Sequence, residues 1–328
     1  MKSYSIITKI HNRKFQNKKI LLVGAGKMAS QYASTLKNMN INDVYVISKN
    51  KQKTKKFCEK YNFNLFDGSL NNLKNYKMDL IIVTPSIDVT LKLLDEILKN
   101  VQQNVLVEKP VSLYSNKIKS CIKKAKNSRV RIGYNRLTYP NYIKLKELIS
   151  RDGGITSCKF TITNRNNKMD FSKGVKDYHN RWGVYNGIHV ISMIYDLIGK
   201  PKKISSYQTG ELEWHNSGSI FVGSGISEKN IPFSYHADWN SAGRWGIEIM
   251  TRKNAYRLIS LEELFKCKID TDNWEKIEFK KSFPNVKQGL AEEIAVMLDK
   301  SLERKIKLVN LEIGYEIVEF GERIFGYN

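Results

Sequence analysis

The chain is 328 residues long and 41% hydrophobic, which is typical of a globular protein with a full core and about two domains. Its 55 Lys and Arg residues outnumber 32 Asp and Glu residues and give a formal net charge of +23, a positive field that favours anionic ligands. No apolar run approaches the roughly 18 residues that cross a bilayer, so we expect no membrane partner.

The distribution of charge argues against nucleic acid as a partner. Lysines recur along the whole chain, and no helix or loop concentrates them with interleaved aromatic residues. The cysteines are far apart and form no Cys/His cluster, which predicts neither a metal site nor a disulfide framework. The first twenty residues lack the apolar stretch of a signal peptide. We therefore expect a cytoplasmic protein that binds a small molecule.

The first 135 residues alternate short apolar strands with helices. Strands are predicted at residues 21–23, 44–47, 78–83, 105–107 and 130–133, and helices at 28–36, 51–61, 89–98 and 115–126. Strands that alternate with helices imply βαβ units and a parallel sheet. We predict a doubly wound α/β domain over residues 1–135. Such a domain binds a dinucleotide when its strand ends carry the matching motifs.

The pattern changes after Pro140. Helices are predicted at 141–149, at 187–198 and from 289 onward, and strands at 158–163, 203–208, 219–222, 232–239, 245–251 and 256–259. Strands dominate this half of the chain, and few of them are separated by a helix. We therefore predict an α+β domain with a large, mostly antiparallel open sheet over residues 136–328.

The clearest motif follows the first predicted strand and reads GAGKMA. This is the G-x-G-x-x-A turn that opens a helix in dinucleotide-binding domains. Gly24 allows the tight turn, Gly26 lets the backbone approach a pyrophosphate, and Ala29 allows close helix packing. Together with Lys27 and Met28, which begin the helix, the two glycines are predicted to bind the cofactor.

The end of the second predicted strand indicates which dinucleotide binds. NAD sites usually place an Asp or Glu there to hold the ribose 2′-hydroxyl. This chain has Ser48, Lys49 and Asn50 instead, and no acid from Ser48 to Phe57. A hydroxyl, an ammonium and an amide suit a 2′-phosphate, so we predict NADP in preference to NAD. The structural alternative is a solvated turn in a lysine-rich protein.

Two later strand ends carry further candidates. Thr84 and Pro85 follow the third strand, and Glu108, Lys109 and Pro110 follow the fourth. Open α/β sheets bind ligands at the carboxyl ends of their strands, so we expect these residues beside the cofactor. Burial can bring a lysine amine into the range of proton transfer, and Lys109 is therefore the candidate catalytic residue. An exposed strand exit is the alternative.

The second domain offers a candidate histidine. If residues 182–191 form one helix, Tyr185 and Asn186 share the face of His189, whose imidazole can exchange a proton near neutral pH. A structural histidine is the alternative, and a tryptophan here can stack on a sugar or pack in the core. The candidate substrate contacts are Arg136, Trp182, Tyr185, Asn186 and Arg244.

These motifs together resemble the Gfo/Idh/MocA (glucose-fructose oxidoreductase, inositol dehydrogenase) family of NAD(P)-dependent sugar oxidoreductases. The resemblance rests on GAGKMA, IIVTP, LVEKP, GYNR and a later N-x-x-H segment, and it covers nearly the whole chain. Segments such as LEWH and GRWG are similar to members from surface-polysaccharide gene clusters. The resemblance implies a Rossmann domain and hydride transfer at a carbon of a nucleotide-activated sugar. It places Lys109 and His189 on either side of that carbon, with a cis bond before Pro110.

The chain departs from the family pattern at three positions. Many members have Asp where Tyr185 and Ser192 stand, and His where Val89 stands. The missing carboxylates weaken the case for His189 as an acid or base, although Tyr185 can substitute as a donor. Two alternatives follow: a non-catalytic sensor that retains the cofactor, and a reductase of an imine or a linear tetrapyrrole on the same fold.

The predicted second sheet is apolar on parts of both faces. Phe233 and Tyr235 alternate with polar residues, but residues 220–222 are apolar in succession. Water over one whole face is therefore disfavoured. Because members of the resembled family often dimerise through this sheet, we expect a homodimer or a homotetramer.

Overall fold

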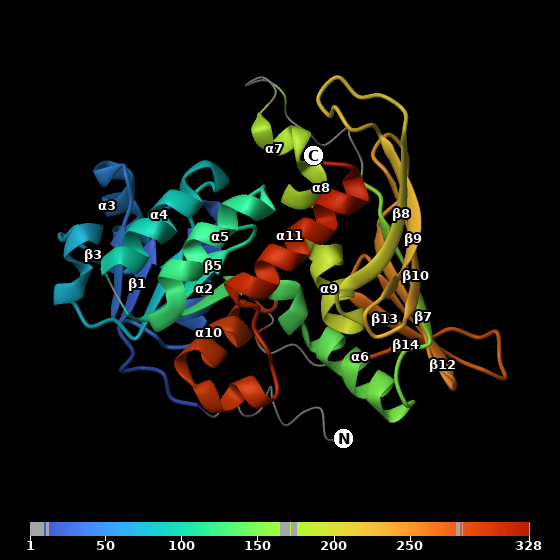
Figure 1. The fold of residues 1–328 in the computed structure, drawn as a ribbon. Coiled ribbons are helices and arrows are strands. Elements are labelled where there is room, and N and C mark those ends of the chain that lie inside the picture. Colours follow the sequence, from blue (N-terminus) through green and yellow to red (C-terminus); the bar gives the residue numbers. More distant parts are fainter. Residues whose placement is uncertain are drawn as a thin grey trace. The chain divides into compact units, whose positions relative to one another are not determined.

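The computed structural model describes residues 10, 13–100, 102–164, 171, 176–279, 283 and 285–327 (Figure 1). The chain forms two compact units. The first comprises Met1–Pro140 and Lys280–Tyr315, and the second comprises Asn141–Phe279 and Glu316–Asn328. The sequence predicts one boundary after residue 135. In the structure the chain passes from one compact unit to the other at three places, after residues 140, 279 and 315.

The first unit is built on a six-stranded parallel sheet in the order β3-β2-β1-β4-β5-β6. Its strands are β1 (Ile20–Val23), β2 (Val44–Ile47), β3 (Asn64–Leu65), β4 (Leu80–Val83), β5 (Asn104–Glu108) and β6 (Arg129–Gly133). Every residue of β1 and β4 is buried, as expected of parallel strands covered on both faces. This is the predicted doubly wound sheet, and its strand order reverses between β1 and β4, where such sheets bind ligands.

Helices cover both faces of this sheet. The connecting elements are α2 (Lys27–Asn38), α3 (Lys51–Tyr61), α4 (Ile87–Asn100) and α5 (Ser115–Lys124), with 3-10 turns η1 (Leu70–Asn75), η2 (Ala125–Asn127) and η3 (Asn135–Thr138). Helix α2 contacts α3 and α10 (Leu290–Leu298), whereas α4 contacts α5. Because βαβ crossovers are right-handed, the two groups lie on opposite faces. Strand β3 was not predicted, since two residues show no periodicity.

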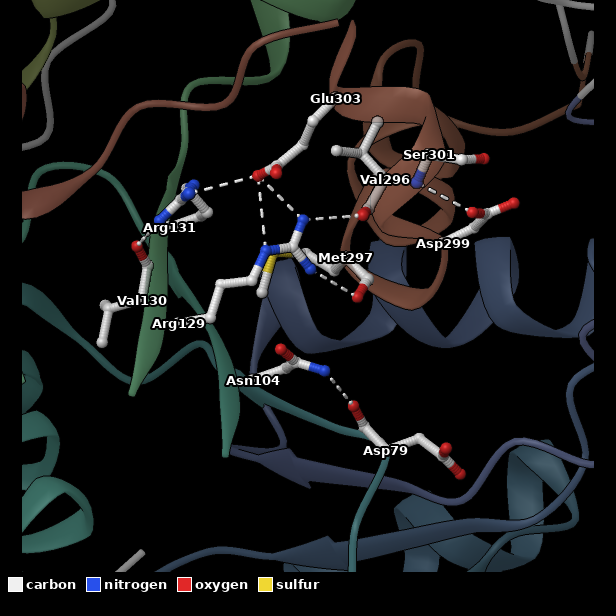
Figure 2. Close-up of polar contacts among 10 residues, drawn as sticks. All are labelled: Asp79, Asn104, Arg129, Val130, Arg131, Val296, Met297, Asp299, Ser301 and Glu303. Carbon is white, nitrogen blue, oxygen red and sulfur yellow. Dashed lines mark hydrogen bonds and ion pairs between the residues drawn. The ribbon is translucent and has the colours of Figure 1, made fainter. Parts of the chain in front are cut away.

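Arginines of β6 hold α10 on the first unit (Figure 2). Arg129 donates to the carbonyl oxygens of Val296 at 2.9 Å and Met297 at 2.8 Å. Its guanidinium also pairs with Glu303 at 2.9 Å, and Arg131 pairs with the same carboxylate at 3.1 Å. A cation near the carboxyl end of a helix complements the helix dipole. This network explains why a segment far along the chain belongs to the first unit.

The second unit is built on an eight-stranded sheet in the order β14-β13-β12-β11-β7-β10-β9-β8. Its strands are β7 (Ser157–Ile162), β8 (Pro201–Thr209), β9 (Ile220–Ser227), β10 (Pro232–Asp238), β11 (Trp245–Met250), β12 (Asn254–Ile259), β13 (Glu263–Lys268) and β14 (Glu275–Ile277). Strands β7 and β10 pair in parallel, and the other pairs are antiparallel. The predicted mostly antiparallel sheet is confirmed. Strands β13 and β14 were not predicted, because charged residues interrupt their apolar pattern.

Helices cover one face of the second sheet. The second unit contains α7 (Asp177–Asn180), α8 (Trp182–Tyr185), α9 (Ile188–Ile198), most of α6 (Pro140–Arg151) and the part of α11 (Leu311–Phe325) from Glu316 onward. Helix α9 contacts β7 and β11. Phe320 and Phe325 of α11 contact Phe233 and Phe221 of the sheet. The apolar inward residues of this sheet are therefore buried under α9 and α11.

The C-terminal helical region of the chain is interrupted. The helical region predicted from Gly289 onward is two helices, α10 and α11, separated by the 3-10 turn η5 (Lys300–Arg304). Asp299 begins this turn, because its Oδ1 accepts the Ser301 amide at 3.0 Å.

Among the described helices, none has the length and apolar character that would let it span a bilayer.

Candidate functional site at the sheet edge and on the second unit

The glycine turn joins β1 to α2 at the carboxyl edge of the parallel sheet. Gly24 has a φ of +117°, and a Cβ there would lie 2.7 Å from Thr84 Oγ1, so both backbone and contact require glycine. A Cβ at Gly26 would meet nothing within 4 Å, and no described side chain caps the helix that follows. The open space and the amides of the first helical turn suit a phosphate.

Three strand ends meet at this turn. The Gly24 amide donates to the Ile47 carbonyl oxygen at 2.8 Å, and the Thr84 amide donates to the Val23 carbonyl oxygen at 2.9 Å. Thr84 Oγ1 donates to the same Val23 oxygen at 3.0 Å. These bonds hold the ends of β2, β1 and β4 side by side. The predicted cofactor residues of the three strands, Pro85 included, therefore share one edge.

The end of β2 presents a lysine. Ser48 Oγ lies 2.6 Å from Thr54 Oγ1. Asn50 Oδ1 accepts the Lys53 amide at 2.9 Å and thereby caps α3. Lys49 between them is exposed. Local hydrogen bonds thus occupy the Ser48 hydroxyl and the Asn50 oxygen, and the Lys49 ammonium is the group best suited to a phosphate at this strand end.

Lys109 follows β5 at the same edge, and its peptide bond to Pro110 is cis, as the resemblance implied. Burial lowers the pKa of Lys109 to about 8. The negative charge of Glu108 opposes this shift, and the positive charges of Lys287 and Arg136 add to it. An amine with such a pKa both accepts and donates protons near neutral pH, which distinguishes Lys109 from an exposed lysine at a strand exit.

Glu108 belongs to a buried carboxyl cluster that no sequence motif marks. The Tyr32 Oη atom lies 3.5 Å from Glu108 Oε1 and 3.2 Å from Glu293 Oε2. Glu108 Oε2 accepts the Lys109 amide at 3.1 Å. Burial raises the pKa of both Glu108 and Glu293. The sequence indicates one member of the cluster at most, because Glu292 and Glu293 are two acids within the otherwise apolar α10.

His189 lies in the second unit, and the helix predicted around it is interrupted. Helix α8 ends at Tyr185 and α9 begins at Ile188. A Cβ at Gly187 would lie 2.6 Å from a backbone oxygen of the preceding helix, so close packing at glycine accompanies the break. Residues 182–191 therefore do not form one helix, and the condition under which Tyr185, Asn186 and His189 would share a helical face is not met.

The His189 ring lies beside an aromatic ring of the second sheet. The His189 side chain is buried, and its ring centroid lies 5.8 Å from that of Trp245 on β11. Ser192, which replaces a carboxylate of the family pattern, is fully buried and donates its hydroxyl to the His189 backbone oxygen at 3.0 Å. The Ser192 hydroxyl therefore serves the backbone of α9.

Three partly exposed rings gather on α7 and α8. The ring centroids of Trp182 and Tyr185 lie 5.6 Å apart, and those of Tyr178 and Tyr185 lie 4.8 Å apart. Two of these residues were predicted substrate contacts, and Tyr178 was missed because a helix of four residues shows no periodicity. Arg244 is exposed just before β11. Arg136 lies in the first unit, where its charge acts on Lys109.

Comparison with known proteins agrees with this fold. Residues 18–136 match the model of the Gfo/Idh/MocA oxidoreductase family, which describes an NAD-binding Rossmann fold. No curated protein matches the chain. Residues 18–136 of the first unit are therefore similar to the NAD-binding Rossmann segment of this family.

Solved structures resemble the chain over nearly its full length at low identity. The UDP-N-acetylglucosamine 3-dehydrogenase of Acidithiobacillus ferrooxidans is 13% identical, with a TM-score of 0.73 over 94% of this chain and 96% of that chain. A protein of Desulfitobacterium hafniense assigned as an NADPH-dependent oxidoreductase is 16% identical, with a TM-score of 0.79 over 95% of both chains. A levoglucosan dehydrogenase in complex with NADH is 13% identical, with a TM-score of 0.77 over 94% and 96%. At these identities the similarity shows a shared fold.

Proposed function

We propose that this chain, whose residues 18–136 match the model of the Gfo/Idh/MocA oxidoreductase family, is an NADP-dependent oxidoreductase of a sugar. It would transfer a hydride to or from a hydroxyl or keto carbon, on a nucleotide-activated sugar used in surface-polysaccharide synthesis. The observation that carries the proposal is Lys109, whose pKa of about 8 suits proton transfer. Two similar folds named above belong to dehydrogenases of a UDP-sugar and of levoglucosan, which supports a sugar. The free cysteines support a reducing, cytoplasmic location.

The first unit fits the dinucleotide that the family implies. The open space at Gly26 and the uncapped start of α2 suit its pyrophosphate. Lys49 is the candidate for the 2′-phosphate, because residues 48–57 contain no acid that would hold a 2′-hydroxyl. When bound, the nicotinamide supplies or accepts the hydride. Thr84 and Pro85 extend the proposed contact surface along the same sheet edge, on the side of β1 away from β2.

Lys109 handles the proton in this proposal. In the oxidative direction its neutral amine accepts the proton of the sugar hydroxyl while the hydride leaves the carbon, and in the reductive direction its ammonium returns that proton. His189 assists by hydrogen bonding to the same oxygen. Arg136, Trp182, Tyr185, Asn186 and Arg244 are the proposed substrate contacts.

Cofactor titration tests the NADP assignment. Wild-type protein should bind NADP more tightly than NAD, and Lys49→Asp should reduce that preference about tenfold or more, because a carboxylate repels the 2′-phosphate. Lys55→Asp, at an exposed position on α3, makes the same charge change away from the strand end and is the control. Equal or tighter binding of NAD by the wild type contradicts the assignment.

A substrate panel tests the reaction class. We expect cofactor turnover with at least one nucleotide sugar, and mass spectrometry of small molecules released from denatured protein can indicate which one. Tight NADP binding without turnover would favour the sensor alternative, to which the backbone-bound Ser192 hydroxyl lends support. Consumption of NADPH with an imine or a linear tetrapyrrole, and not with sugars, would favour the reductase alternative.

A second copy of the chain is the proposed partner for the outer face of the second sheet. On this face Tyr207 is 68% exposed, Val222 38% and Ile259 39%. Tyr207, Val222 and His236 are register partners across β8, β9 and β10. A hollow of about 360 Å³ opens between β10, β7, β11 and β12. Such a face can be shared by two subunits related by a twofold axis.

Light scattering tests this oligomer proposal. The wild type should have the mass of a dimer or a tetramer at micromolar concentration, and Val222→Lys should lower it. Lys253→Glu, at an exposed position in the turn before β12, is a charge control that should leave the mass unchanged. A monomeric wild type contradicts the proposal.

A further inference from the structure

Three buried side chains meet next to Lys109. Tyr32 and Glu293 have no exposed surface, and Glu108 is 9% exposed. They come from α2, α10 and β5, and the Tyr32 hydroxyl contacts both carboxyl groups, at 3.2 Å and 3.5 Å. A phenol has one hydrogen and can donate it to one carboxyl group at a time. If both contacts are hydrogen bonds, one carboxyl group must carry a hydrogen of its own.

Gly133 on β6 makes room for this cluster. It is the register partner of Glu108, and a Cβ there would lie 2.9 Å from Tyr32 Oη and 3.5 Å from Glu293 Oε2. The Arg129 bonds to the last carbonyl groups of α10 hold the helix that carries Glu293 (Figure 2). The packing of four elements, α2, α10, β5 and β6, therefore brings both carboxyl groups to the Tyr32 hydroxyl.

The hydrogen-bond partners identify which carboxyl group carries the proton. Both Glu108 oxygens have donors, namely the Lys109 amide and the Tyr32 hydroxyl. The buried Oε1 of Glu293 has no hydrogen-bond partner among the described residues. An ionised oxygen without a donor is costly in such a place, whereas a neutral acid is tolerated. Glu293 can then donate from Oε2 to Tyr32, and Tyr32 can donate to Glu108.

The charges around the cluster agree with this order. Burial raises the pKa of Glu293, and the negative charges of Glu108 and Glu292 raise it further, against Lys287. Burial raises the pKa of Glu108 as well, but there the positive charges of Lys109 and Lys287 oppose the shift. Two like charges in one buried site push their pKa values apart. The pair should therefore hold one negative charge, located on Glu108.

We propose that Glu293 is a neutral acid that donates to Tyr32, which donates to the ionised Glu108, so that Lys109 faces one carboxylate and not two. Glu293 is a positioning residue that acts through Glu108, and only this relevance to catalysis rests on the proposed function. Lys109 otherwise faces Arg136 and Lys287. A second carboxylate would hold its ammonium protonated more strongly, and the neutral Glu293 avoids this.

Infrared spectroscopy of the unliganded protein tests the protonation state directly. Near neutral pH the wild type should show the carbonyl stretching band of a protonated carboxylic acid. Glu293→Gln should lose this band, and Glu292→Gln, which changes the neighbouring acid of the same helix, should keep it. Tyr32→Phe should shift its frequency, because the acid loses its acceptor. The proposal is overturned if the band is absent from the wild type or persists in Glu293→Gln. Absence of the band from the wild type is decisive even if a variant does not fold.

Titration of Lys109 tests the charge that it faces. The lysine ε-carbon can be followed by ¹³C NMR, with Lys109→Met to assign the signal. Glu293→Gln should move the Lys109 pKa by less than about half a unit, because an amide replaces a neutral acid, whereas Glu108→Gln should lower it by about one unit or more. An equal drop in both variants overturns the proposal. Neither measurement needs a substrate, so failure of the sugar panel would leave these results intact.

Discussion

The carboxyl edge of the parallel sheet and the α7 to α9 region of the second unit differ in the groups they present. The sheet edge gathers charged side chains, above all Lys109 and Glu108, whose ionisation is shifted by burial. The α7 to α9 region gathers rings, among them Trp182 and Tyr185, and it also carries the buried His189. Under the proposed function, we expect the first region to move the proton and the second to recognise the shape of the substrate.

The largest expected effect follows from replacing the amine at the sheet edge. Lys109→Met should lower turnover by about a hundredfold or more, the usual contribution of a general acid or base, and should leave NADP binding largely intact. Lys55→Met, at an exposed lysine on α3, is the control. If turnover of Lys109→Met stays within a few-fold of the wild type, a group other than Lys109 transfers the proton.

A smaller effect is expected from the histidine of the second unit. If His189 assists through one hydrogen bond, His189→Asn should lower turnover by about fivefold, since such a bond contributes about 1 kcal/mol. Steady-state kinetics with the substrate found in the panel measures it. A loss of turnover as large as that of Lys109→Met would show that His189 transfers the proton itself. The proton chemistry would then belong to the α7 to α9 region and not to the sheet edge.

The smallest effect is expected from the rings. Trp182→Ala should raise KM by roughly twofold to tenfold with little change in kcat, because an aromatic contact contributes about 0.5–1.5 kcal/mol. Trp274→Ala is the matched control, since Trp274 stacks on Arg257 in the second sheet at 4.1 Å. An unchanged KM for Trp182→Ala would remove the shape-recognition role from this region.

The strand ends could be predicted from sequence, whereas the cluster behind them could not. Strand β2 and helix α3 match the predicted residues 44–47 and 51–61, because their patterns and end signals are local. The contact between Tyr32 and Glu293 spans 261 positions and depends on tertiary packing of α10. The break between α8 and α9 was missed for a similar reason, since the close packing at Gly187 involves residues outside the local pattern.

The pH dependence of kcat/KM in the oxidative direction tests the central claim, that the half-buried Lys109 transfers the proton through its side-chain amine. Oxidation needs the neutral amine, so kcat/KM should rise as the pH increases through about 8, the pKa of Lys109, and the reductive reaction should fall over the same interval. The kcat/KM of the residual activity of Lys109→Met should not show this change with pH. An identical pH profile in the wild type and in Lys109→Met would contradict the account.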